Sequence, residues 1–279
     1  MKNALPQLAT LTCALLAACA DAPTVPSPSA IVPPLAAAPI KYGSLDGAAH
    51  PAVVLLIAEV GGQPAWRCTG TLISPVFVIT AGHCTGNTGE ISGARVFTES
   101  DVQNGTNSYP FAGANAVEAV GWWTFPGYTD AAFFRYDVGI VKLARPVVLP
   151  AAAYGVIPGL DQLDALKPSG STTFTAVGYG LQFSNPAHVM AQRVRMTATP
   201  RLVQINTAFT GPASLLLSNN ASTGGMCFGD SGGPSFIGTT NVIAAVTSFA
   251  INPTCSGTGG VFRLDRAAVR AFIAETLTK

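Results

Sequence analysis

The sequence predicts an all-β fold. Short runs rich in valine, isoleucine, threonine and phenylalanine are typical of strands, and glycine, proline, asparagine and serine lie between them. We expect strands at residues 52–58, 72–80, 140–143, 172–177, 242–249 and 260–263. The pattern indicates a barrel or a sandwich and does not by itself distinguish the two.

One helix is expected, at residues 265–277. Asp265 can cap its first free N–H groups. The apolar side chains that follow fall on one face, which we expect to pack on the strands: Val269, Phe272, Ile273 and Thr276–Leu277.

Composition indicates a folded body and excludes a nucleic-acid partner. The chain has 279 residues, enough for one large domain or two of ordinary size. Charged residues make up only 10% and the formal net charge is +1, whereas nucleic-acid binding calls for a basic patch. Hydrophobic residues make up 48% and are spread through the chain, which argues against disorder.

Residues 1–19 have the build of an export signal. Lys2 precedes a short apolar run, and small residues follow. Leu16-Ala17-Ala18-Cys19 also resembles the bacterial lipobox, in which the cysteine is lipidated and becomes the mature N-terminus. The alternative is ordinary signal cleavage after Ala20. We expect an exported lipoprotein of the cell envelope (periplasm or outer membrane), attached to the membrane through lipidated Cys19, or a secreted protein if the alternative holds.

Residues 20–39 are rich in proline and alanine. Proline disfavours a helix here and favours an extended, semi-rigid chain. We interpret this segment as a tether or a propeptide, followed by the folded body at residues 40–279.

Three motifs supply the groups that acyl transfer by serine requires. Thr80-Ala81-Gly82-His83-Cys84 offers a base, Asp137-Val138-Gly139-Ile140-Val141 an acid, and Gly229-Asp230-Ser231-Gly232-Gly233-Pro234 a nucleophile. A serine hydroxyl is a weak nucleophile unless an imidazole takes its proton, and a carboxylate fixes the tautomer of that imidazole. The sequence therefore predicts a serine hydrolase.

The order of the three residues narrows the class. In α/β-hydrolases the acid and the histidine follow the serine, but no histidine follows Ser231. A subtilisin-like order would need Asp46 as the acid, and no motif of that class surrounds it. The order His83, Asp137, Ser231 remains.

The competing residues lack supporting context. Asp130 is the nearest alternative acid, but the apolar run that would anchor a buried carboxylate follows Asp137 instead. His50 and His188 lack flanking motifs, so we expect both to be structural, in contrast to His83.

In this order the motifs resemble those of the chymotrypsin/trypsin-like serine peptidases. Secondary matches extend the resemblance from about Ile40 to the C-terminus: Val177-Gly178-Tyr179-Gly180, Ser248-Phe249-Ala250 and Gly260-Val261-Phe262. The resemblance implies two six-stranded antiparallel Greek-key barrels with the active site in the cleft between them. The first barrel would cover about 40–155, the second about 156–264 and the C-terminal helix about 265–277.

The same resemblance assigns roles to the motif residues. It implies a serine-type endopeptidase in which His83 is the general base, Asp137 orients it and Ser231 forms an acyl-enzyme. The backbone N–H groups of Gly229 and Ser231 would form the oxyanion hole, because glycine lets this backbone turn tightly and approach a substrate carbonyl. Such an enzyme acts on a peptide or protein substrate, and we expect a monomer with no cofactor and no metal.

Four cysteines remain once Cys13 and Cys19 are set aside, an even number that suits an oxidising compartment. The resemblance pairs Cys68 with Cys84 and Cys227 with Cys255. A zinc site is the alternative, but the close Cys-x-x-Cys pairs that structural zinc usually needs are missing.

Asp230 marks a departure from the family. There the matching aspartate receives a freed N-terminal ammonium, but Ile40 and Gly43 only loosely match the usual start, and no arginine or lysine precedes Ile40. Two hypotheses follow: cleavage between Pro39 and Ile40 by another enzyme, or an Asp230 that is satisfied internally.

The expected substrate pocket is apolar. Trypsin-like members carry an aspartate six residues before the nucleophile, where this chain has Gly225, followed by Met226. Without that carboxylate nothing offsets the desolvation of an arginine or lysine side chain. The remaining substrate-binding candidates are Ser248, Phe249, Ala250 and Gly260. The sequence therefore predicts cleavage of a substrate after small or medium apolar residues.

Two other functions stay open at this point. One is a non-catalytic binding protein built on a peptidase fold, which the complete set His83, Asp137 and Ser231 disfavours. The other is an esterase-like or single-substrate hydrolase, which would use the same machinery.

Overall fold

The computed structural model describes residues 39–86, 89–132, 134–206 and 211–279. The expected export signal, Cys19 and all of the tether before Pro39 lie outside the described residues. In the part of the chain that is described, no helix is long and apolar enough to cross a membrane.

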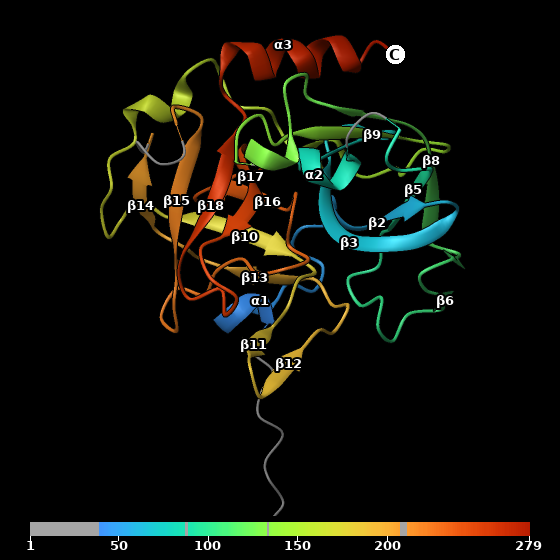
Figure 1. The fold of residues 1–279 in the computed structure, drawn as a ribbon, viewed down its shortest axis with the longest axis horizontal. Coiled ribbons are helices and arrows are strands. Elements are labelled where there is room, and N and C mark those ends of the chain that lie inside the picture. Colours follow the sequence, from blue (N-terminus) through green and yellow to red (C-terminus); the bar gives the residue numbers. More distant parts are fainter. Residues whose placement is uncertain (1–38, 87–88, 133, 207–210) are drawn as a thin grey trace, which may run out of the picture. The chain divides into compact units, whose positions relative to one another are not determined.

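Six antiparallel strands form a closed barrel in the first half, in the order β2-β3-β4-β9-β8-β5 (Figure 1). The strands are β2 Val53–Val60, β3 Gln63–Leu72, β4 Phe77–Thr80, β5 Gly93–Phe97, β8 Ala116–Thr124 and β9 Gly139–Leu143. Alternate side chains of β2 enter two different apolar clusters, with Leu55 in one and Leu56 in the other. Both faces of β2 are therefore buried, which explains its continuous apolar sequence.

The second half is an eight-stranded antiparallel sheet in the order β1-β13-β10-β16-β17-β18-β15-β14. Its strands are β1 Ser44–Leu45, β10 Phe174–Gly178, β13 Met196–Ala198, β14 Leu202–Ile205, β15 Ser214–Asn219, β16 Pro234–Ile237, β17 Ile243–Ala250 and β18 Gly257–Arg263. Only residues 199–201 separate β13 from β14, yet β13 pairs with β10 and β14 pairs with β15. The sheet therefore curls round on itself, and β1 is added along β13.

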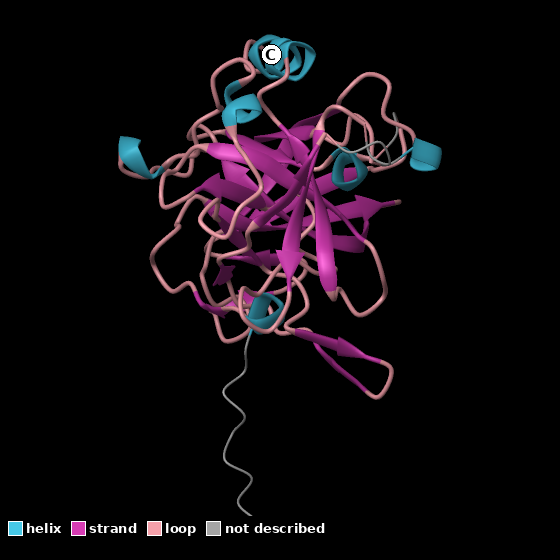
Figure 2. Ribbon diagram, turned by 90° about the vertical axis from the view of Figure 1, so that its left-hand side faces the viewer, coloured by secondary structure: helices cyan, strands magenta, loops and turns pink. Residues whose placement is uncertain are grey.

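The remaining elements are short and lie around the strands (Figure 2). They are the helices α1 Pro39–Tyr42 and α2 Gly82–Thr85, the hairpin strands β6 Asn107–Ser108, β7 Ala112–Gly113, β11 Phe183–Asn185 and β12 His188–Met190, and the 3₁₀ helices η1 Asp130–Ala132, η2 Ala151–Ala153 and η3 Gln162–Ala165. The two short strands β6 and β7 pair with each other in the segment between β5 and β8.

Two local expectations were wrong. Residues 72–80 are not one strand, because β3 ends at Leu72 and Ser74 Oγ accepts the N–H of Phe77 in a turn before β4. The C-terminal helix α3 (Ala267–Thr276) lies where expected, but Asp265 does not cap it. Its carboxylate is held by Arg263 instead.

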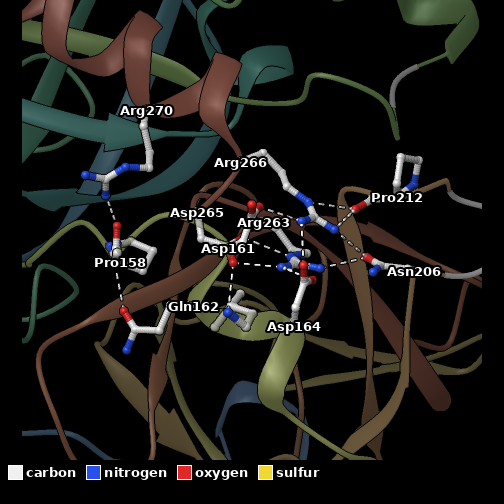
Figure 3. Close-up of polar contacts among 12 residues, drawn as sticks. Pro158, Asp161, Gln162, Asp164, Asn206, Pro212, Arg263, Asp265, Arg266 and Arg270 are labelled. Atoms are coloured by element: carbon white, nitrogen blue, oxygen red, sulfur yellow. Dashed lines mark hydrogen bonds and ion pairs between the residues drawn. The ribbon is translucent and has the colours of Figure 1, made fainter.

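A buried ion-pair network joins the start of α3 to η3 (Figure 3). Arg263 and Asp265 are both fully buried and form two hydrogen bonds, of 2.9 and 2.7 Å. The remaining donors of Arg263 reach Asp164 and Asn206, each at 2.8 Å. A buried arginine needs such partners because desolvating an unpaired charge is strongly unfavourable, so this network takes the carboxylate that the helix cap would have used.

Candidate active site

His83 lies on the single turn α2, directly after β4. Its Nδ1 is 3.0 Å from Asp137 Oδ2, and its backbone N–H donates to Asp137 Oδ1 at 2.9 Å. Both the ring and the backbone of His83 are thus held by one carboxylate. With the Nδ1 proton directed at Asp137, Nε2 is left as the basic nitrogen.

Asp137 is fully buried immediately before β9. Besides His83, it accepts a hydrogen bond of 2.5 Å from Ser248 Oγ on β17. The competing carboxylate, Asp130, is exposed on η1 and accepts a hydrogen bond from Tyr128 OH at 3.1 Å. The structure therefore brings His83 together with Asp137.

Two opposing influences act on the pKa of His83. Burial lowers it, whereas the charge and hydrogen bond of Asp137, with a smaller contribution from Asp130, raise it by more. The net pKa lies above the ordinary histidine value, which suits an imidazole that accepts a proton during reaction.

Ser231 lies in a loop that requires glycine on both sides. Gly229 and Gly232 have φ values of +92° and +78°, which side chains rarely adopt. A Cβ at Gly232 would also collide with Thr80 Oγ1. Ser231 itself is fixed through its carbonyl oxygen, which accepts the N–H of Thr69 at 2.8 Å.

The backbone N–H groups of Gly229 and Ser231 have no acceptor among the described residues. The carbonyl of Gly229 accepts a hydrogen bond from Thr69 Oγ1 at 2.9 Å, which holds the Gly229–Asp230 peptide group between these two N–H groups in place. N–H groups held in this way, without an internal partner, suit the stabilisation of a substrate oxyanion.

A cavity of about 360 Å³ opens beside Ser231. It is mostly apolar and is lined by His83, Met226, Cys227, Phe228, Ser231, Thr247, Ser248, Phe249 and Ala250. His83 and Ser231 therefore face the same space, although they lie on opposite halves of the fold.

Four of the expected substrate-binding residues line this cavity: Met226, Ser248, Phe249 and Ala250. Gly225 and Gly260 are not among its lining residues. A Cβ at Gly225 would collide with the Asn219 side chain, and one at Gly260 would collide with the Phe249 ring. Phe228 and Thr247, which the sequence did not single out, complete the wall together with the disulfide residue Cys227.

Asp230 is satisfied by two backbone N–H groups, one in the nucleophile loop and one just after β10. Its carboxylate accepts the N–H of Gly180 at 2.7 Å and that of Cys227 at 2.8 Å. Burial nevertheless raises its pKa to about 7, against the lowering effect of these N–H groups and of the nearby Arg67 charge. Ile40 lies elsewhere, buried in a small apolar cluster with Met196.

The two expected disulfides are present. Cys68–Cys84 connects β3 to α2 beside His83, and Cys227–Cys255 connects the nucleophile loop to the segment after β17. Cys68, Cys84 and His83 offer three clustered donor atoms, but a disulfide leaves no thiolates to bind zinc. This cluster therefore does not fit a metal.

The other histidines lie apart from this constellation. His50 Nδ1 is 2.5 Å from Asp46, whose other oxygen is 2.8 Å from Arg195, so the Asp46 carboxylate links two segments in a structural network. His188 is exposed on the β11–β12 hairpin.

The chain is similar to known proteins in both sequence and fold. Residues 46–268 match the family model described as Trypsin. The chain is 24% identical to Trypsin iota of Drosophila melanogaster over 60% of its own length and 63% of that protein's, just under two thirds. It is 28% identical to Chymotrypsin of Phaedon cochleariae, over 76% and 72% of the two chains. The solved structure of HL collagenase has the same fold, with a TM-score of 0.65 and 16% identity over 86% of this chain and 99% of that one.

Proposed function

This chain belongs to the trypsin family, and we propose that it is an exported serine endopeptidase that works through an acyl-enzyme intermediate. The observation that carries the proposal is that His83, bound to the buried Asp137, and Ser231 line one apolar cavity. No cofactor is required for this chemistry.

Each step uses a group of this chain. His83 Nε2 takes the proton of Ser231 Oγ as that oxygen attacks the substrate carbonyl carbon. The N–H groups of Gly229 and Ser231 stabilise the oxyanion, and Asp137 stabilises the imidazolium. The imidazolium then protonates the leaving amine, and water releases the acyl group by the same sequence with His83 again as base.

The cavity supports a preference for small or medium apolar side chains before the scissile bond. Its lining contains no charged side chain other than His83, so a bound arginine or lysine would lose its hydration without a compensating carboxylate. Met226 lines the cavity and is 4% exposed, and its bulk limits the size of side chain that the cavity accepts.

We also propose that the chain works without cleavage before Ile40. In support, Asp230 already accepts two backbone hydrogen bonds, so it needs no terminal ammonium to be satisfied. We further propose that the protein is exported as a lipoprotein attached through Cys19 and that it acts as a monomer.

The decisive experiment is labelling with a fluorophosphonate probe, with Ser231→Ala as the control, followed by intact mass. Labelling of the natural chain but not of Ser231→Ala supports an activated serine. A mass that includes residues before Ile40 supports activity without cleavage, and a diacylglycerol mass on Cys19 supports lipidation. Labelled material that always begins at Ile40 overturns the claim about cleavage.

A panel of peptide anilides with alanine, leucine or arginine before the scissile bond then tests specificity. Faster cleavage of the arginyl anilide would overturn the apolar preference. No labelling and no cleavage in the natural chain would favour the binding-protein alternative, and cleavage of esters alone would favour an esterase.

A further inference from the structure

Lys41 is a buried cation far in sequence from the catalytic residues. It is 3% exposed, and no carboxylate lies within ion-pair distance of it in the described part of the chain. Its Nζ donates hydrogen bonds to the carbonyl oxygen of Thr254 and, at 2.6 Å, to Ser256 Oγ. An ammonium is unfavourable in a buried position unless its donors are satisfied, so these two acceptors fix where the side chain lies.

The backbone of Lys41 holds a second segment. Its carbonyl accepts the N–H of Gly225 at 3.1 Å, and the two residues form an antiparallel bridge. We call residues 40–45 the N-terminal strap. The strap is anchored on both sides of Lys41, because Ile40 is fully buried against Val194, Met196 and Ala198, and β1 pairs with β13. In Figure 1 the strap passes beneath β13, close to the β11–β12 hairpin.

The two segments that Lys41 contacts lie next in the chain to two walls of the substrate cavity, one formed by Met226, Cys227 and Phe228 and the other by the lining residues of β17. Gly225 leads directly into the lining residues Met226, Cys227 and Phe228. Thr254 and Ser256 flank Cys255 in the loop that follows the lining residues of β17. The Cys227–Cys255 disulfide joins the same two segments with a Cα–Cα distance of 5.4 Å. The disulfide connects them covalently at one point, and Lys41 bridges them again through hydrogen bonds.

From these contacts we infer that Lys41 is a positioning residue: it holds the two walls of the substrate cavity at the separation that binds a peptide side chain. The inference rests on the proposed peptidase function. Lys41 touches neither the substrate nor the reacting atoms. Its loss should therefore weaken substrate binding and leave the reactivity of Ser231 unchanged.

The test compares KM, kcat and the fluorophosphonate labelling rate in full-length Lys41→Met and in the natural chain, with a leucyl peptide anilide as substrate. We expect KM to rise about tenfold, because both hydrogen bonds of the Lys41 ammonium are lost, with kcat and the labelling rate within about twofold. Lys41→Arg, which keeps a cationic donor, should recover part of the loss.

Lys142→Met is the matched control. Its Nζ also donates to a backbone carbonyl, that of Lys279 at 2.8 Å, but at an exposed site away from the cavity, so its kinetics should not change. A purely structural role for Lys41 would lower the active fraction, and with it kcat and the labelling amplitude, without raising KM. That result would overturn the inference, as would an unchanged KM.

If Lys41→Met does not fold, Ser256→Ala tests the inference about Lys41 instead. Ser256 is exposed, so its removal should leave the fold intact, and it removes one acceptor of Lys41. We expect KM to rise about threefold, and an unchanged KM would overturn the inference. Absence of labelling in the natural chain would instead refute the proposed peptidase function.

Discussion

Ser248 Oγ donates a hydrogen bond of 2.5 Å to Asp137 Oδ2, which links β17 of the curled sheet to the acid that precedes β9 of the closed barrel. The orientation of Asp137, and through it that of His83, therefore depends on how the two halves of the fold pack together. The Ser248 hydroxyl satisfies an oxygen of a carboxylate that is completely buried.

Replacing Ser248 with alanine should lower kcat/KM about tenfold, because Asp137 loses a charge-assisted hydrogen bond and holds the imidazole less firmly. Steady-state kinetics on an alanyl anilide measure the effect. Ser235→Ala is the control, because the Ser235 hydroxyl is also buried but has no hydrogen-bond partner in the described structure. Equal losses in both variants would contradict the prediction.

The pH dependence of kcat/KM should report the titration of His83. Its pKa is raised, so the protonated and inactive form persists above pH 6.5, and kcat/KM should reach half of its plateau above that pH. Asp137→Asn should lower kcat about 10⁴-fold, because the imidazole then takes the wrong tautomer. An activity midpoint at or below pH 6.5 in the natural chain would show that the charge and hydrogen bond of Asp137 do not outweigh the effect of burial on this pKa.

Asp230 should make the fold less stable as the pH rises. Its pKa is about 7 in the folded protein and 3.8 by its ordinary value, so between these values the native state holds a proton that the unfolded state has lost. The contribution of Asp230 to the free energy of unfolding should therefore fall between pH 4 and pH 7.

Urea unfolding of the natural chain and of Asp230→Asn checks this dependence. The stability of the natural chain relative to the variant should be greater at pH 4.5 than at pH 7.5. A relative stability that grows with pH would mean that the two backbone N–H groups lower this pKa by more than burial raises it.

Removing Asp265 should destabilise the protein by about 3–5 kcal/mol, because Asp265→Ala leaves the fully buried Arg263 with too few acceptors. Chemical unfolding measures the loss. Asp161→Asn weakens an exposed pair with Arg266 at the edge of the same network and should change stability by less than about 1 kcal/mol. Similar losses in the two variants would show that burial does not set the strength of these pairs.

The catalytic candidates could be found from the sequence because each carries a local signal. His83 follows a strand and precedes a cysteine, Asp137 precedes an apolar run, and Ser231 lies among glycines whose positive φ values the structure then shows. The family resemblance supplied the disulfide pairing, which the structure contains. Part of the pocket wall could also be predicted, since Met226 and residues 248–250 lie in or next to recognisable motifs.

Contacts between residues far apart in the chain could not be found in this way. The sequence marks Ser248 as a substrate-binding candidate, but nothing near it indicates that its hydroxyl reaches Asp137, 111 residues away. Asp265 fits a helix cap by its position, yet it pairs with Arg263 because the packed sheet buries that arginine.

The sequence by itself determined the all-β class, the order of the three catalytic candidates and the absence of a carboxylate at the expected pocket position. Only the tertiary structure decided how β13 and β14 curl the second sheet, how Asp230 is satisfied, and that Lys41 contacts both Gly225 and Ser256. Local motifs can be recognised in the sequence because they depend on interactions between residues that are close together in the chain. Burial and pairing across the fold are set only when the two sheets close and remove water from the groups between them.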